Sequence, residues 1–409
     1  MHKTILYAAL ISASSAAFAG SGQLLPAGPA DLVSTHISNA ALPAGNFEHQ
    51  PVSFHWVLDP GAELATATPF VSESREYWTQ VDATEMQRGF AIDTTAPGAV
   101  VRVSPIGKSL PAAPEQLHLL QAGSAVKADL AFAHRANAEQ LQQAGMDVSN
   151  GSAVVQFNPQ LGQGRFQLQM ANAQGRYLVH VFEPNSPYAL RAQANHANLL
   201  AGDRVDVSAG LANGRTNLSG TQMTGVLVAP SGQTYPLNFA VNSRGEMHAS
   251  AQLPAQASAA PGLWEAQVFA GASENGNPIQ RDTRTAFAVA QPTARLTGQY
   301  RFDPLSMRVT LPLQIGASGR YGVGGTLYAT APDGVARPVA VAQSAAWFEP
   351  GQHASSLGFD RASVPLGYRA PFELRYVELK DQTRQAQLET RELALREGRA
   401  VRPIADNLR

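Results

Sequence analysis

One short pattern occurs twice in this chain, and it constrains the fold more than any other feature. Residues 225–232 read GVLVAPSG and are followed by His-Ala-Ser at 248–250, while residues 325–334 read GTLYATAPDG and are followed by His-Ala-Ser at 353–355. A period of ~100 residues is too long for a solenoid repeat and matches one immunoglobulin-sized β-sandwich. The sequence therefore predicts tandem sandwich modules. Such modules carry many unrelated functions, so the repeat by itself predicts no activity.

The first 19 residues have the layout of a cleaved signal peptide. Lys3 gives a basic start, residues 5–11 form an apolar centre, and Ala-Phe-Ala at 17–19 precedes Gly20. The apolar run is shorter than the ~20 residues that span a bilayer, and no second run of spanning length follows. We therefore expect an exported protein, periplasmic or extracellular, with no membrane span.

The composition excludes several chemistries. The chain has no cysteine, which rules out disulfides, cysteine nucleophiles and cysteine-ligated metals. Its 30 basic and 31 acidic side chains give a net charge of −1, unlike a nucleic-acid-binding protein with a concentrated basic face. We expect no nucleic-acid partner and no cofactor.

Short runs of alternating apolar and polar residues, separated by Gly, Pro and Asn, predict an all-β protein. The expected fold is a pair of tandem immunoglobulin-like β-sandwiches after a mostly-β N-terminal domain with one short helix. The expected divisions are a signal peptide (1–19), an irregular leader (20–50), the N-terminal domain (51–187), one sandwich (188–291) and a second sandwich with a charged C-terminal tail (292–409).

Two local patterns refine this prediction. Asn137 followed by Gln140 is a capping box, and Gly145 can end the helix that it opens. Near the C-terminus, alternation at residues 386–395 predicts a last strand, and the charges crowding this region suggest an exposed edge or tail. A helix over residues 388–396 is the competing interpretation.

Catalytic motifs are scarce. The chain has no Gly-x-Ser-x-Gly elbow, no His-Glu-x-x-His helix and no Walker loop. His49, His55 and Asp59 are the nearest to a metal site, and His55 with Asp59 are the candidate catalytic residues. Their spacing matches no standard motif, and polar residues around a Pro-Gly turn are more typical of a solvated loop. We therefore predict no metal.

Tyr77 is the candidate binding residue. Strand alternation in the segment REYWTQV places Trp78 on one face, which we expect to be the inner one, and Tyr77 on the outer face beside Arg75. An exposed tyrosine can contact a carbohydrate or a peptide. The alternative is a core tryptophan with a tyrosine at the rim. Trp264 and Trp347 are expected in the cores of the repeated modules, although Trp347 also suits a loop tip.

Three segments carry a resemblance to a known family. GFAIDTTAPGAVVRVSP at residues 89–105, VHVFEPNSP at 179–187 and LKDQ at 379–382 resemble an uncharacterised family of exported Gram-negative bacterial proteins. The family has an N-terminal domain of unknown function followed by immunoglobulin-like modules. The resemblance covers nearly all of the mature chain, and it implies architecture and export but brings no activity or site residues.

Two functions of different classes follow. The first is an exported, non-enzymatic binding or accessory protein that presents β-sandwich surfaces to a macromolecular partner, a protein or a carbohydrate. The alternative is a secreted hydrolase with its site in the N-terminal domain, using His55 and nearby carboxylates. Convergence of His49, His55 and Asp59 in one concave pocket would favour the hydrolase.

Overall fold

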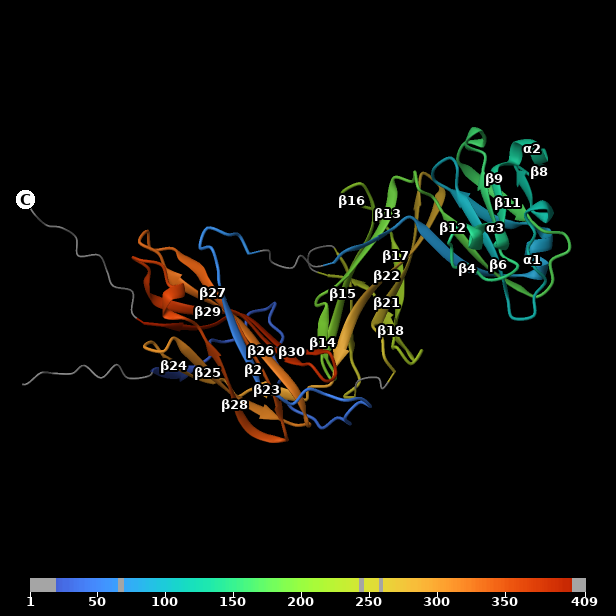
Figure 1. The fold of residues 1–409 in the computed structure, drawn as a ribbon. Helices are drawn as coiled ribbons and strands as arrows, with labels where there is room; N and C mark the ends of the chain where they lie inside the picture. The colour runs from blue at the N-terminus through green and yellow to red at the C-terminus, as the bar shows by residue number, and fades with distance from the viewer. Residues whose placement is uncertain (1–19, 65–69, 243–245, 257–259, 399–409) are drawn as a thin grey trace, which may run out of the picture. The chain divides into compact units, whose positions relative to one another are not determined.

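The structure is a computed structural model that describes residues 20–64, 70–242, 246–256 and 260–398 (Figure 1). The expected signal peptide and residues 399–409 of the expected tail lie outside the described residues. The sheets are antiparallel, and strands account for most of the regular structure, which confirms the all-β prediction. The helices within the described ranges are α1 (Ala83–Arg88), α2 (Ala128–Ala131) and α3 (Ala138–Gln143), with short 3-10 turns at Pro114–Gln116, Pro159–Leu161 and Arg361–Ser363.

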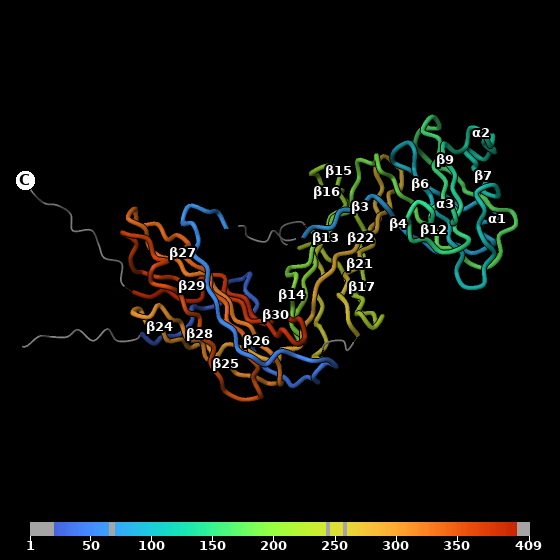
Figure 2. Tube along the Cα trace, viewed as in Figure 1, coloured from blue at the N-terminus to red at the C-terminus, as the bar shows by residue number. Residues whose placement is uncertain are grey.

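The chain divides into two compact units, and the division differs from the expected boundaries. Of the described residues, 20–64 join 290–398 in what we call the C-terminal unit, and those from 70 to 289 form the central unit. The expected leader and the first residues of the expected N-terminal domain thus belong with the C-terminal sandwich. Figure 2 traces this path, with the blue N-terminal segment running among the orange strands.

The C-terminal unit is a sandwich of two sheets. One sheet has the order β1 (Gly20–Gln23), β24 (Gln299–Asp303), β25 (Arg308–Ile315) and β23 (Ala294–Leu296), with β28 (Gly351–Gly358) also paired to β25. The other has the order β2 (Val52–Val57), β27 (Ala336–Phe348), β26 (Gly319–Thr330), β29 (Arg369–Asp381) and β30 (Ala386–Glu397). The N-terminal segment therefore supplies one edge strand, β1 or β2, to each sheet.

The central unit contains two lobes that share its longest sheet. That sheet has the order β18 (Thr234–Asn238), β17 (Gln222–Val228), β21 (Trp264–Glu274), β22 (Asn277–Ala290), β4 (Glu76–Asp82), β12 (Arg176–Phe182), β6 (Val100–Ile106), β10 (Ala153–Phe157) and β9 (Phe132–Asn137), with β14 (Asn198–Leu200) paired to β22. We call the part built on β4 to β12 the N lobe and the part built on β13 to β22 the middle lobe.

A second sheet covers each lobe. In the N lobe it has the order β5 (Phe90–Thr94), β11 (Gly164–Gln169), β7 (His118–Gln121) and β8 (Ser124–Ala125). In the middle lobe it has the order β19 (Ala240–Val241), β20 (Met247–Gln252), β15 (Arg204–Asn213), β13 (Tyr188–Ala194) and β3 (Ser72–Ser74), with β16 (Thr216–Asn217) paired to β15. Each lobe has its own apolar core.

The repeat seen in the sequence is a repeat of strand order. The middle lobe has the order β18-β17-β21-β22 opposite β20-β15-β13, and the C-terminal unit has β27-β26-β29-β30 opposite β28-β25-β24. The two repeated Gly-x-Leu segments lie in β17 and β26, and the two His-Ala-Ser segments lie in β20 and β28. The prediction of tandem β-sandwich modules is therefore confirmed.

The capping-box prediction is also confirmed. The Asn137 side chain accepts a hydrogen bond from the Gln140 N–H at 2.9 Å, and the Gln140 side chain accepts one from the Asn137 N–H at 3.0 Å. Helix α3 follows, and Gly145 takes a φ of +82° just beyond it. The helix contributes Leu141 to a small apolar cluster with Val148 and Val154, so it covers one end of the N-lobe sheet.

The charge-rich C-terminal segment is a strand, as predicted in preference to a helix, but its charges are not all exposed. Asp381 and Glu389 are completely buried, and Arg391 is 7% exposed. Glu389 accepts hydrogen bonds from the Leu296 N–H at 3.0 Å and from Arg391 Nε at 2.7 Å. The expected exposed charged edge is therefore wrong for these residues, which pair inside the sandwich.

A buried ion pair joins the two lobes of the central unit. Arg281 Nη2 lies 2.6 Å from Glu183 Oε2, and each side chain is 1% exposed. Glu183 also accepts hydrogen bonds from the N–H groups of Thr95 and Ala96, at 2.5 and 3.1 Å. Arg281 donates to the Ser186 hydroxyl at 2.7 Å. The charges are compensated on all sides, as buried charges must be.

Candidate binding surface

Strand β2 leaves every one of its side chains exposed. Its sequence, VSFHWV, contains no charged residue and no proline. Phe54 and Trp56 point to the same side of the strand and are 42% and 49% exposed, with ring centroids 4.7 Å apart in an edge-to-face arrangement. Aromatic residues exposed together in this way are typical of recognition surfaces.

Strand β2 also has a free backbone edge. It pairs with β27 from Val52↔Ala345 to Val57↔Ala340, and the Leu58 N–H donates to the Val339 carbonyl at 2.9 Å. Hydrogen-bonded pairs alternate along an antiparallel ladder, so the N–H and C=O groups of Ser53, His55 and Val57 point away from β27. Within the described residues, β2 is the last strand of its sheet on this side.

The opposite edge of the same sheet is protected. Strand β30 carries charged residues, and residues 25–32 run along it. The Leu25 N–H donates to the Ala394 carbonyl, and the Thr390 N–H donates to the Leu32 carbonyl, both at 2.8 Å. Natural sheets blunt their edges with charge or a covering segment. Strand β2 has no charge, and within the described residues no further strand pairs with it.

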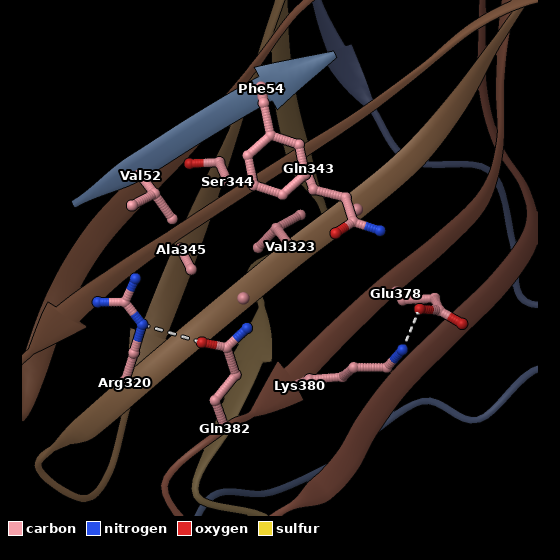
Figure 3. Close-up of a pocket in the computed structure, with 12 residues that line it drawn as sticks. Val52, Phe54, Arg320, Val323, Gln343, Ser344, Ala345, Glu378, Lys380 and Gln382 are labelled. Carbon is pink, nitrogen blue, oxygen red and sulfur yellow. Dashed lines mark hydrogen bonds and ion pairs between the residues drawn. The ribbon is translucent and has the colours of Figure 1, made fainter. Parts of the chain in front are cut away.

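A shallow hollow lies on the sheet beside β2 (Figure 3). Two rows of residues cross the sheet here, Val52–Ala345–Gly322–Lys380 and Phe54–Gln343–Gly324–Glu378. Gly322 and Gly324 have no side chains, so the surface is depressed between Val52 and Phe54 on one side and Lys380 and Glu378 on the other. Lys380 Nζ lies 2.5 Å from Glu378 Oε2. The hollow encloses about 130 Å³, below the ~300–1,000 Å³ of small-molecule sites.

His49, His55 and Asp59 belong to this region and not to the N lobe. His49 stacks on Trp347 with centroids 3.9 Å apart, and His55 projects from β2. Asp59 accepts a hydrogen bond from the Gly61 N–H at 2.8 Å and so caps a turn. Each residue is exposed and has a different local role. No group of three His, Cys, Asp or Glu residues that could hold a metal occurs in the described ranges.

The expected orientation of Tyr77 and Trp78 is reversed. Tyr77 is 5% exposed and belongs to the N-lobe core, and burial raises its pKa. Trp78 lies on the outer face, stacked on His180 at 4.0 Å, with the Arg102 guanidinium 4.7 Å from its ring centre. The correct orientation could have been predicted from the sequence. Trp78 shares its strand face with the polar residues Glu76 and Gln80, whereas Tyr77 shares its face with the apolar Val81.

The other tryptophans divide between the two expectations. Trp264 is 2% exposed in the middle-lobe core, as predicted. Trp347 is only partly buried, and its indole N–H donates to Glu349 Oε1 at 2.7 Å. The Ser318 hydroxyl and this indole both donate to Glu349, which lowers the pKa of its carboxyl group.

Asp282 is a carboxyl group at the junction of the two lobes whose pKa is raised strongly. It lies where β22 meets β4, opposite Glu76. Its Oδ2 accepts a hydrogen bond from the Trp78 N–H at 2.7 Å. Burial raises the pKa of Asp282 to about 6, and this hydrogen bond opposes the increase. The junction between the lobes therefore contains a group that titrates near neutral pH.

The family follows from comparison with known domain profiles. The N-terminal domain of a family named Domain of unknown function (DUF4785) matches residues 43–183, and its C-terminal domain matches residues 293–396. Together the two matches cover more than half of the chain. This protein belongs to the DUF4785 family. The N-terminal match begins before β2, so the family profile includes the strand that completes the C-terminal sandwich.

Solved structures support the fold. The chain is similar to the crystal structure of a DUF4785 family protein from Legionella pneumophila subsp. pneumophila strain Philadelphia 1, with a TM-score of 0.69 and 21% identity over 91% of this chain and 99% of that one. A mutant Salmonella alpha-2-macroglobulin aligns with a TM-score of 0.18 and 11% identity over 83% of this chain and 24% of that one, too low to carry an argument. No curated protein matches the sequence.

None of the helices in the described ranges combines the length and hydropathy needed to cross a lipid bilayer.

Proposed function

We propose that this protein is an exported, non-enzymatic binding or accessory protein, and that an extended segment of a protein partner pairs with β2. The proposal rests on the edge of β2, which no other strand of the described residues covers. Backbone groups of Ser53, His55 and Val57 point outward there, and the rings of Phe54 and Trp56 are exposed. Pairing of a peptide with a sheet edge is a recurring mode of recognition.

The surface can supply useful affinity. Phe54 and Trp56 are each nearly half exposed, so covering them removes roughly 150–200 Å² of surface from water, worth about 4–5 kcal/mol. Each backbone hydrogen bond to β2 adds roughly 0.5–1.5 kcal/mol net. Ordering the partner and losing translational freedom reduce this total. These terms favour a transient to moderately tight complex.

The geometry favours a macromolecule over a small substrate. The hollow next to Phe54 is small and open, and two of its charged residues, Lys380 and Glu378, pair with each other. Export is part of the proposal and rests on the signal-peptide layout of residues 1–19.

A peptide array of exported Gram-negative bacterial proteins, the class that the family resemblance indicates, tests the proposal. The full-length protein is applied beside two variants at residue 55. His55→Pro removes an N–H that points away from β27, which an edge strand tolerates, and so blocks pairing from outside. His55→Thr is the matched control, because it changes the side chain and keeps the N–H. A third variant, Phe54→Ser with Trp56→Ser, removes the rings.

We expect specific peptides to bind the wild type and His55→Thr, and to lose at least ~10-fold in affinity with His55→Pro and with the double serine variant. Circular dichroism checks that each variant is folded. Equal binding by His55→Pro and His55→Thr would contradict strand pairing. A glycan array run in parallel distinguishes the carbohydrate alternative, since glycans that bind through the rings would be indifferent to His55→Pro.

A further inference from the structure

A second hollow, of about 450 Å³, lies at the end of the β2-β27-β26-β29-β30 sheet where β26 ends and β29 begins. Its volume falls within the ~300–1,000 Å³ typical of small-molecule sites. Three arginines line it, Arg369 and Arg375 from β29 and Arg396 from β30. No sequence motif marks this site, because only the pairing of β30 with β29 brings Arg396 next to the two arginines of β29. In this pairing Glu373 lies opposite Arg396.

A buried carboxylate holds two of the arginines in place. Glu373 is 3% exposed, and its two oxygens bind different guanidinium groups. Oε2 accepts from Arg375 Nε at 2.7 Å and lies 2.5 Å from Arg375 Nη2. Oε1 accepts from Arg396 Nε at 2.7 Å and lies 2.6 Å from Arg396 Nη2. The Arg375 guanidinium also lies 4.7 Å from the ring centre of Tyr328. Both forks are therefore preorganised.

The hollow has an excess of positive charge. One carboxylate, Glu373, faces three guanidinium groups, and the remaining acid of the lining, Asp333, is paired with Arg337 at 2.5 Å. Arg375 and Arg396 direct Nε and Nη2 at Glu373, and their Nη1 groups have no acceptor in the described part of the chain. Arg369 is exposed and, within the same residues, its side chain has no hydrogen-bond partner.

We propose that this hollow binds a small ligand through an oxyanion, a phosphate or a carboxylate group, held by Arg369, Arg375 and Arg396. Planar guanidinium groups bind such oxygens bidentately, and fixed forks lose little entropy on doing so. Glu373 is a positioning residue that orients two of the forks. This site is separate from the β2 edge and does not depend on the function proposed for that edge.

Calorimetric titration of the full-length protein tests the proposal. The probes are inorganic phosphate, glycerol phosphate and acetate, each at constant ionic strength maintained with sodium chloride. The key variant is Arg369→Gln, because Arg369 is exposed and its side chain makes no hydrogen bond or ion pair with the described residues. Arg301→Gln is the matched control, since Arg301 is an exposed arginine on β24 of the other sheet and its loss changes the net charge equally.

We expect saturable one-site binding by the wild type and by Arg301→Gln, and affinity reduced at least ~10-fold in Arg369→Gln with unchanged thermal unfolding. Tighter binding of the phosphates than of acetate would assign the natural oxyanion to a phosphate, and the reverse order to a carboxylate. No saturable binding of any probe, or equal losses in Arg369→Gln and Arg301→Gln, would overturn the proposal.

Discussion

The buried pair Glu183–Arg281 offers the sharpest test of how the central unit is held together. Glu183→Gln keeps the shape and one acceptor oxygen, but it leaves the Arg281 guanidinium buried without a counter-charge. Removing one partner of a buried pair costs about 3–5 kcal/mol. In a unit of this size, each kcal/mol of lost stability lowers the melting temperature by about 2–4 °C. The melting temperature of Glu183→Gln should therefore fall by roughly 6–20 °C.

A double variant separates the charge effect from loss of packing. Glu183→Gln with Arg281→Met removes both charges and keeps an acceptor for the Thr95 and Ala96 N–H groups. Neutral replacement of a whole buried pair is often tolerated, so the double variant should recover at least about 2 kcal/mol relative to Glu183→Gln. The control is Glu73→Gln, because Glu73 is 35% exposed in its pairs with Arg75 and Arg191, and exposed pairs contribute about 0–1 kcal/mol.

Urea unfolding followed by tryptophan fluorescence measures these differences. Replacing Trp56 and Trp347 by Phe leaves Trp78 in the N lobe and Trp264 in the middle lobe as reporters of the central unit. The single variant Arg281→Met completes the cycle. If Glu183→Gln costs no more than Glu73→Gln, or if the double variant loses the sum of the Glu183→Gln and Arg281→Met losses, the network does not stabilise the junction as described.

Two further predictions concern single groups, Asp282 at the junction of the two lobes and Asn137 in the N lobe. A carboxyl group whose pKa is raised by burial stabilises the fold fully below its ordinary value near 3.8, and this contribution is lost as pH rises through about 6. Asp282→Asn, which keeps an acceptor for the Trp78 N–H, should therefore stabilise the central unit at pH 7 by at most roughly 3 kcal/mol. It should also remove this group's contribution to the pH dependence of urea unfolding between 3.8 and about 6. No gain at pH 7 would refute this. Asn137→Ala should cost about 0.5–2 kcal/mol by removing the α3 cap, and Asn137→Gly only a few tenths, as measured by the same unfolding assay; an Asn137→Ala variant as stable as the wild type would show that the cap contributes nothing.

Local patterns in the sequence were sufficient for some elements. The capping box predicted α3, alternation predicted β30 despite its charges, and Trp264 was placed in a core. These features depend on neighbours in the chain, where propensity and side-chain periodicity act directly.

Long-range pairing decided the rest. The sequence analysis placed His55 in the N-terminal domain, because local patterns do not show which sheet a strand joins, and β2 pairs with β27 almost 300 residues later. The candidate site therefore lies in the C-terminal unit and not in the N lobe, and its main residues are Phe54 and Trp56. Glu373 and Arg396 likewise meet only through the register of β29 and β30. Sequence spacing carries no information about either juxtaposition.

Amide hydrogen exchange along β2, measured residue by residue by NMR in the free protein and with the tightest-binding array peptide, tests the central claim most directly. In the free protein, the Ser53, His55 and Val57 N–H groups should exchange fast, whereas those of Phe54, Trp56 and Leu58 should be protected by β27. The bound peptide should protect the first set. If those three amides are already protected in the free protein, or remain fast in the complex, the edge of β2 is not where a partner strand binds.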